Sequence, residues 1–205
     1  MLSRTKMTGS RLTLLPDGNF APLLPELKGR LAVAAKSITP GNFASLLDTT
    51  MRREIHMAFD QAGASEGTVW LVEDESRALV PAYNTGPNAQ KIVNQFHQPL
   101  TSGLISMVYA SEQPFLENEV FQNAKQDKSL DTSLNVQTYA MIAVPFYFLD
   151  ACRGVISCIV LRQPGAAEPP VVRFDEAARL RVSHAATAIG RLIDYRVLQA
   201  TLGVQ

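Results

Sequence analysis

The chain has 205 residues, 46% of them apolar, and its 19 basic and 19 acidic side chains give a formal net charge of zero. This length fits one well-filled domain with an extension, and the balanced charge gives no electrostatic reason to expect nucleic acid or an anionic membrane surface as a partner. No apolar run approaches the roughly 20 residues of a membrane span, and the start lacks the apolar core of a signal peptide. We therefore expect a cytoplasmic protein that does not engage a membrane.

The first 40 residues are predicted to form an N-terminal arm. Residues 1–20 have a mixed composition, which indicates an arm that is poorly ordered or depends on a partner. A short helix is predicted over residues 22–35, and Pro40 then interrupts the chain. Residues 41–202 are assigned to one folded domain.

An amphipathic helix is predicted over residues 42–62. Asn42 is a residue type that caps helix N-termini, and Gly63 is typical of the position after a helix. Apolar residues recur between them at helical spacing: Phe43, Leu47, Met51, Ile55, Ala58 and Ala62.

The period then changes from that of a helix to that of a strand. Residues 67–73 and 78–83 are predicted to form two strands joined by a charged turn. Short helices are predicted over residues 89–96, 103–110 and 129–134. The region 89–136 mixes polar atoms with aromatic rings, and such a composition suits the wall of a cavity.

Two apolar runs within residues 139–161 predict a central antiparallel hairpin whose loop spans residues 149–154. In the second run Val155, Ser157 and Ile159 point to one face, whereas Ile156 and Cys158 point to the other. A strand that is apolar on both sides is covered on both sides. We therefore expect helices on one face of the sheet and a folded loop region on the other.

The chain is predicted to end in a long helix over residues 171–202, after a loop at residues 163–170. This helix has two apolar stripes, of which one can cover the sheet while the other needs a partner. The first stripe is Ala177, Leu180, His184, Ala188, Leu192, Tyr195 and Leu198; the second is Val182, Ala186, Ile189, Ile193, Val197 and Ala200. We expect this helix to pair with the helix at 42–62 and, across a homodimer interface, with a second copy of both.

Residues 42–202 resemble the GAF domain family of small-molecule sensing domains. In residues 99–115 a helix that begins at a glycine is followed by a proline and a new strand. Ala140-Met-Ile-Ala-Val-Pro-Phe146, with Arg153-Gly-Val-Ile-Ser157, is similar to the central hairpin of the family, and Phe174-Asp175 is similar to the start of its last helix. The resemblance implies an α+β fold of the PAS/GAF type, with about six antiparallel strands, terminal helices on one face and a ligand pocket on the other.

Carried onto this sequence, the resemblance places the pocket among aromatic, amide and thioether side chains from the strands and the middle region. These candidate ligand-binding residues are Trp70, Tyr83, Phe96, Tyr109, Phe115, Asn118, Phe121, Tyr139 and Met141.

Specialised branches of the family attach a pigment or reduce methionine sulfoxide through cysteines in the middle region, and residues 89–136 contain none. His56, His97 and His184 fall on separate elements without the spacing of metal ligands. We expect neither a metal nor catalysis, and the sequence names no cofactor. Catalysis through Cys152 or Cys158 is the enzymatic alternative.

The sequence thus predicts a sensor that binds a small, partly apolar molecule and transmits through its terminal-helix dimer to a separate effector protein. The alternative is a ligand-free dimerisation and interaction module whose pocket is filled by its own side chains. Neither hypothesis involves nucleic acid.

Overall fold

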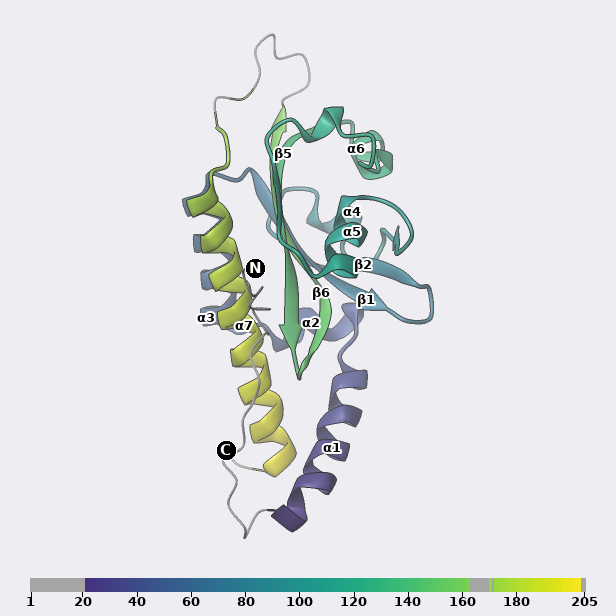
Figure 1. Cartoon of the computed structure of the whole chain (residues 1–205), viewed down its shortest axis with the longest axis vertical. Helices are drawn as coiled ribbons and strands as arrows, with labels where there is room; N and C mark the ends of the chain where they lie inside the picture. Colours follow the sequence, from purple (N-terminus) through teal and green to yellow (C-terminus); the bar gives the residue numbers. More distant parts are fainter. Residues whose placement is uncertain (1–20, 163–169, 171, 204–205) are drawn as a thin grey trace, which may run out of the picture.

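The computed structural model describes residues 21–162, 170 and 172–203. Its strands form an antiparallel sheet of six, in the order β3-β2-β1-β6-β5-β4. In Figure 1, α3 and α7 lie along one face of this sheet, and α4, α5 and α6 lie on the other. The predicted α+β architecture, with about six antiparallel strands between two helical layers, is confirmed.

The elements have the following bounds. The strands are β1 (Glu66–Glu73), β2 (Ala78–Asn84), β3 (Gln98–Pro99), β4 (Phe115–Glu117), β5 (Gln137–Phe148) and β6 (Ala151–Arg162). The helices are η1 (Ala21–Leu23), α1 (Leu24–Ser37), α2 (Pro40–Leu46), α3 (Thr49–Ala62), α4 (Ala89–Ile92), α5 (Leu104–Ser111), η2 (Val120–Gln122), α6 (Ser129–Leu134) and α7 (Glu176–Leu202). None of these helices is long and apolar enough to cross a lipid bilayer.

The central strands separate two hydrophobic cores. On β1, Val69 and Leu71 belong to the core beneath α3 and α7, whereas Trp70 belongs to the core beneath α5. On β6, Ile156 belongs to the first core and Val155 to the second. Because successive side chains of a strand point to opposite faces, each of these strands contributes to both cores.

Two glycines allow the layers to approach closely. A Cβ atom at Gly190 of α7 would lie 2.1 Å from the carbonyl oxygen of Tyr147 on β5, and a Cβ atom at Gly67 of β1 would lie 2.2 Å from the ring of Phe59 on α3. Neither position has room for a larger residue, so α7 and α3 lie directly on the sheet.

The single helix predicted over residues 42–62 is wrong, because the structure breaks it into α2 and α3. Asp48 caps α3 by accepting a hydrogen bond from the Met51 amide at 2.7 Å. Asn42 lies inside α2, where it forms a capping box with Thr39. Gly63 ends α3 in the left-handed conformation, with φ 78°, as predicted.

Two arginines bind the carbonyl groups that the break between α2 and α3 leaves without helical partners. Arg196 of α7 donates to the Leu46 carbonyl at 2.9 Å and to the Asp48 carboxylate at 2.5 Å. Arg52 of α3 donates to the carbonyls of Ala44 and Leu47. The apolar period of the sequence continues across the break, so it does not reveal where the helix ends. The contacts of the two arginines occur where the chain changes direction between α2 and α3.

Two other predicted boundaries are corrected. The turn of the central hairpin consists of Leu149 and Asp150, both at positive φ, and β6 already begins at Ala151. The last helix begins at Glu176 with Asp175 as its cap, so residues 172–174 are not helical. Val171 and most of the predicted loop at 163–170 lie outside the described residues. Of the two predicted stripes on α7, the one containing Val182 and Ile189 is buried against the sheet.

We predict that Arg196→Met destabilises the fold by about 1 kcal/mol, because it removes two partly exposed hydrogen bonds to the α2–α3 break and retains the aliphatic stem. Urea denaturation measures the change. Arg191→Met, at an exposed position of the same helix, is the matched control and is expected to change stability by less than about 0.5 kcal/mol. Equal effects of the two substitutions would contradict this role of Arg196.

Candidate functional site

A cavity of about 70 Å³ lies between the sheet and the small helices α4, α5 and α6. Its floor comes from alternate residues of neighbouring strands: Glu66, Thr68 and Trp70 of β1 with Ser157 and Ile159 of β6. This face corresponds to the side on which the sequence predicts a pocket. The volume is below the roughly 300 Å³ of ordinary ligand pockets, so this conformation has space for a group of a few non-hydrogen atoms.

Trp70 is the largest side chain of the cavity floor and the sole tryptophan of the chain. Its indole Nε1 donates to the Ser157 hydroxyl at 2.9 Å, and its ring meets Phe96 edge to face with the ring centroids 6.2 Å apart. A buried indole with a satisfied N–H group and an aromatic neighbour is held in one orientation. Trp70 therefore presents a fixed aromatic surface to the cavity.

The polar wall of the cavity is acidic. Glu66, Asp127 and Asp131 line it, and no Lys, Arg or His occurs among the described residues that do so. Asp127 accepts hydrogen bonds from the amide and hydroxyl of Ser129 and from Gln98. These bonds, those of Ser129 above all, lower the pKa of the Asp127 carboxyl.

Glu66 is the most buried of these acids, with 7% of its surface exposed. Burial raises the pKa of its carboxyl above the ordinary 4.5; a hydrogen bond from Asn84 opposes this shift, and the negative charge of Asp131 adds to it. A Cβ atom at Gly86 would lie 2.0 Å from a Glu66 carboxylate oxygen. The loop after β2 therefore closes over this carboxylate, and a side chain at residue 86 would displace it.

Asp131 links the start of β5 to the loop before α6. Its carboxylate accepts bonds from the amide and hydroxyl of Thr138, at 2.8 and 2.7 Å, and from Nε2 of Gln126 at 3.2 Å. The other amide atom, Oε1 of Gln126, is buried and has no hydrogen-bond partner among the described residues. The wall therefore contains a buried amide acceptor that no described residue satisfies.

The nine residues predicted from the resemblance lie in three different settings. Trp70, Phe96 and Met141 line the cavity. Tyr109 and Phe115 pack against the same core without lining it. Tyr83, Phe121, Tyr139 and Asn118 lie elsewhere: the first three belong to or pack against the core under α3 and α7, and Asn118 bonds the amide and carbonyl of Phe174.

The residues predicted from the sequence are mainly aromatic, and none of them is an acid of the cavity wall. Glu66 directly precedes the predicted strand, and the period of two that makes Thr68 and Trp70 face alike also includes residue 66. That alternation could have identified Glu66 as an inward-facing acid. No local pattern brings Asp127 and Asp131, from the middle region, to the same wall.

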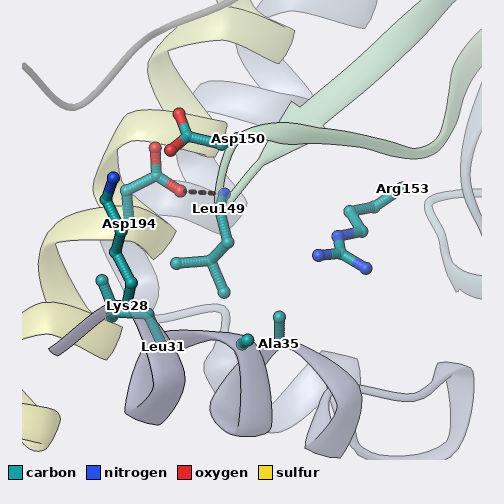
Figure 2. A pocket seen from close by; sticks show the side chains of 8 residues that line it. Lys28, Leu31, Ala35, Leu149, Asp150, Arg153 and Asp194 are labelled. Atoms are coloured by element: carbon teal, nitrogen blue, oxygen red, sulfur yellow. Dashed lines mark hydrogen bonds between the residues drawn. The ribbon is translucent and has the colours of Figure 1, made fainter. Parts of the chain in front are cut away.

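A second cavity, of about 170 Å³, lies between α1, the hairpin turn and α7. Figure 2 shows Lys28, Asp150 and Asp194 on one side of it and Arg153 on the other. Buried Asp194 accepts a hydrogen bond from the amide of Leu149 at 2.6 Å. The carboxylate therefore satisfies a backbone donor of the turn and joins α7 to the tip of the hairpin.

Neither a metal centre nor a reactive thiol is found in the described part of the chain. No group of three His, Cys, Asp or Glu side chains there could hold a metal ion. Burial raises the pKa of Cys152 to about 11 and that of Cys158 to about 12. Both thiols are therefore protonated at neutral pH, which disfavours nucleophilic attack.

The architecture is that of a GAF domain. Among solved structures, the GAF domain of a phosphoenolpyruvate-protein phosphotransferase (ptsP) from Coxiella burnetii is similar with a TM-score of 0.59 at 12% identity, covering 88% of this chain and 96% of its own. The corresponding domain from Acinetobacter gives 0.56 at 12% identity over 88% and 97%. The free methionine-R-sulfoxide reductase of Neisseria meningitidis, in complex with its substrate, gives 0.54 at 18% identity over 97% and 100%.

The sequence matches no family model and no curated protein. The structural likeness, at identities below 20%, establishes a GAF-like fold for this chain and agrees with the resemblance seen in its sequence. A fold hosts many functions, so the function has to be argued from the site.

We predict that Glu66→Gln removes a loss of stability that the wild type undergoes as the pH rises. Because the pKa of Glu66 is raised above 4.5 in the folded state, its contribution is fully present below that pH and is lost as the pH rises through the folded-state pKa. Glutamine does not ionise, so the free energy of unfolding of the variant, relative to the wild type, is expected to increase from about pH 4.5 to neutrality.

Urea denaturation at a series of pH values measures this difference. The matched control is Glu75→Gln in the exposed turn between β1 and β2, which is expected to retain the pH dependence of the wild type. A stability difference between Glu66→Gln and the wild type that stays constant with pH would show that ionisation of Glu66 carries no cost.

Proposed function

We propose that this protein is a GAF-like regulatory domain that binds a small molecule in the cavity over β1, β6 and β5. The observation that carries the proposal is the cavity itself, which has a fixed aromatic surface, a polar wall and an unpaired buried acceptor. A few placed polar groups among apolar ones are characteristic of ligand sites. The GAF domains among the similar structures, which include that of the cyanobacteriochrome receptor PixJ, support the same class of function.

The central strands, which are buried on both faces, connect the cavity physically to helices α3 and α7. Trp70 contributes to the cavity floor, while Val69 and Leu71 beside it pack beneath α3 and α7. A ligand that shifts β1 therefore also shifts the surface on which those helices lie. Binding shifts the equilibrium between two arrangements of α3 and α7 only to the extent that the ligand has different affinities for them.

A ligand-free interaction module is the second candidate, and the small volume of the cavity favours it. Phe121 and Tyr139, which the sequence assigned to the pocket, stack on each other with ring centroids 5.3 Å apart and lie outside the cavity. In this alternative the side chains of the fold fill most of the pocket space.

Binding and regulation are proposed in preference to catalysis. Some neighbours of similar fold are methionine-R-sulfoxide reductases, but the thiols of this chain have raised pKa values, and neither Cys152 nor Cys158 lines the cavity. The acids of the cavity wall are hydrogen-bonded or buried, which suits ligand recognition.

The first test is native mass spectrometry of the protein purified from its own host, compared with its denatured mass. We expect an excess mass of small-molecule size that is lost on denaturation. Ile159→Phe, which places a larger side chain on the cavity floor, is expected to abolish the excess. Leu180→Phe, on the exposed face of α7, should retain it. A clean protein mass, together with Trp70 fluorescence that a metabolite extract leaves unchanged, would favour the interaction module.

We further propose that the protein is a homodimer that pairs through α3 and α7. The proposal rests on the first stripe of α7, which keeps exposed apolar side chains while the second stripe covers the sheet: Leu180 is 43% exposed and Tyr195 58% exposed. Met57 adds a partly exposed apolar side chain on α3, and α3 packs beside α7. A second copy offers the same apolar surface in return, as a two-fold interface requires.

Tyr195→Glu is expected to convert a dimer into a monomer, because it places a charge in an apolar interface. Light scattering after size-exclusion chromatography measures the mass. Ala124→Glu, at an exposed position of the middle region, introduces the same charge away from the helices and should leave the mass unchanged. A wild-type protein that is monomeric at all accessible concentrations would rule out the dimer.

A further inference from the structure

The cavity has a chemical bias that narrows the class of its ligand. Its charged side chains, as far as the described residues show, are the carboxylates of Glu66, Asp127 and Asp131. An anionic ligand would add charge of the same sign to this wall with no cation to compensate it. The field inside the cavity therefore selects against anions.

The nitrogen donors of the wall already have acceptors within the protein. Nε1 of Trp70 donates to Ser157, and Nε2 of Gln98 donates to the Ser102 carbonyl and to Asp127. Nε2 of Gln126 donates to Asp131. A ligand that needs side-chain N–H donors from the wall would have to break one of these bonds or rely on the second N–H of Gln126.

Two acceptors, in contrast, retain capacity: the Glu66 carboxylate accepts one hydrogen bond, from Asn84, and Oε1 of Gln126 accepts none from the described residues. The Glu66 carboxylate is buried, with no basic side chain among the described residues of the wall, and Oε1 of Gln126 is buried without a partner. Leaving a buried acceptor unpaired or a buried charge uncompensated costs free energy. A ligand that brings N–H groups and a positive charge removes both costs at once.

We propose that the ligand is a small organic cation: a primary ammonium on a short apolar body. The ammonium group would be held by Glu66 and Gln126, and the body would lie against Trp70 and Phe96, where aromatic faces also attract cations. The cavity of about 70 Å³ has room for roughly five water-sized groups, which sets the size of the body. This inference rests on the proposed function, because it requires that the cavity binds a ligand.

A series of isosteres that differ in charge tests the proposal. The probes are 3-methylbutylamine, 3-methylbutanol and 3-methylbutanoate, which present a cation, a neutral donor and an anion on the same carbon skeleton. Because Trp70 is the sole tryptophan, its fluorescence reports on the cavity. We expect the amine to change this fluorescence with an affinity about 10- to 100-fold above that of the alcohol, as for a hydrogen bond to a charged group, and the carboxylate to leave it unchanged.

Two substitutions test which residues cause the preference for the amine over the alcohol. Glu66→Gln is expected to bring the affinity of the amine to within a few-fold of that of the alcohol, while Glu75→Gln, which removes the same charge from the exposed β1–β2 turn, preserves the full difference. Gln126→Met, which removes the second acceptor, is expected to weaken amine binding several-fold. Far-ultraviolet circular dichroism confirms that each variant is folded.

The outcomes separate this inference from the proposed function. Tighter binding of the alcohol or the carboxylate than of the amine, or a neutral or anionic molecule found by native mass spectrometry, would overturn the cationic ligand and leave the binding function intact. An amine preference that survives Glu66→Gln overturns the assigned site. No fluorescence response to any probe, together with no bound mass, overturns both.

Discussion

Burial of the central strands on both faces is the constraint on which the rest of this structure depends. Strands β1, β5 and β6 carry apolar side chains on each side, so each face has to be covered, and covering requires two separate layers. Helices α3 and α7 form one layer, with Gly190 and Gly67 permitting direct contact with the sheet. The small, shorter helices of the middle region form the other, and the cavity lies beneath them.

The difference between the two layers that cover the sheet explains the position of the candidate site. The helical layer buries large side chains in close packing, with Phe43, Phe146 and Ile189 almost completely inaccessible. The opposite layer is built from loops and helices of a few turns, whose backbone and polar side chains need hydrogen-bond partners. Asp131 and Gln98 supply those partners, and so polar atoms reach the cavity wall.

The sequence predicted the elements whose information is local and missed those that depend on distant contacts. The alternation of residues 155–161 identified β6, and the helical period of residues 42–62 identified the helical character of α2 and α3 but not the break between them. The sequence does not reveal the break at Leu47 and Asp48, because the apolar period runs through it. The side chain of Arg196, which binds the carbonyl at this break, lies some 150 residues away in the chain. Trp70 and Phe96 were placed in the pocket by the family resemblance, whereas the proximity of Glu66 to Asp131 follows from tertiary structure.

The bond between Asp194 and the Leu149 amide has a consequence for how α7 can move. It joins the helix to the hairpin tip at a buried point, one turn beyond the close contact of Gly190 with β5. Rotation of the helix about its own axis would pull the carboxylate from the amide and turn side chains against the Tyr147 carbonyl, where only a glycine fits. A rocking motion about these two points retains both, so a signal that passes through α7 would travel as a change of tilt and be largest at the two ends of the helix.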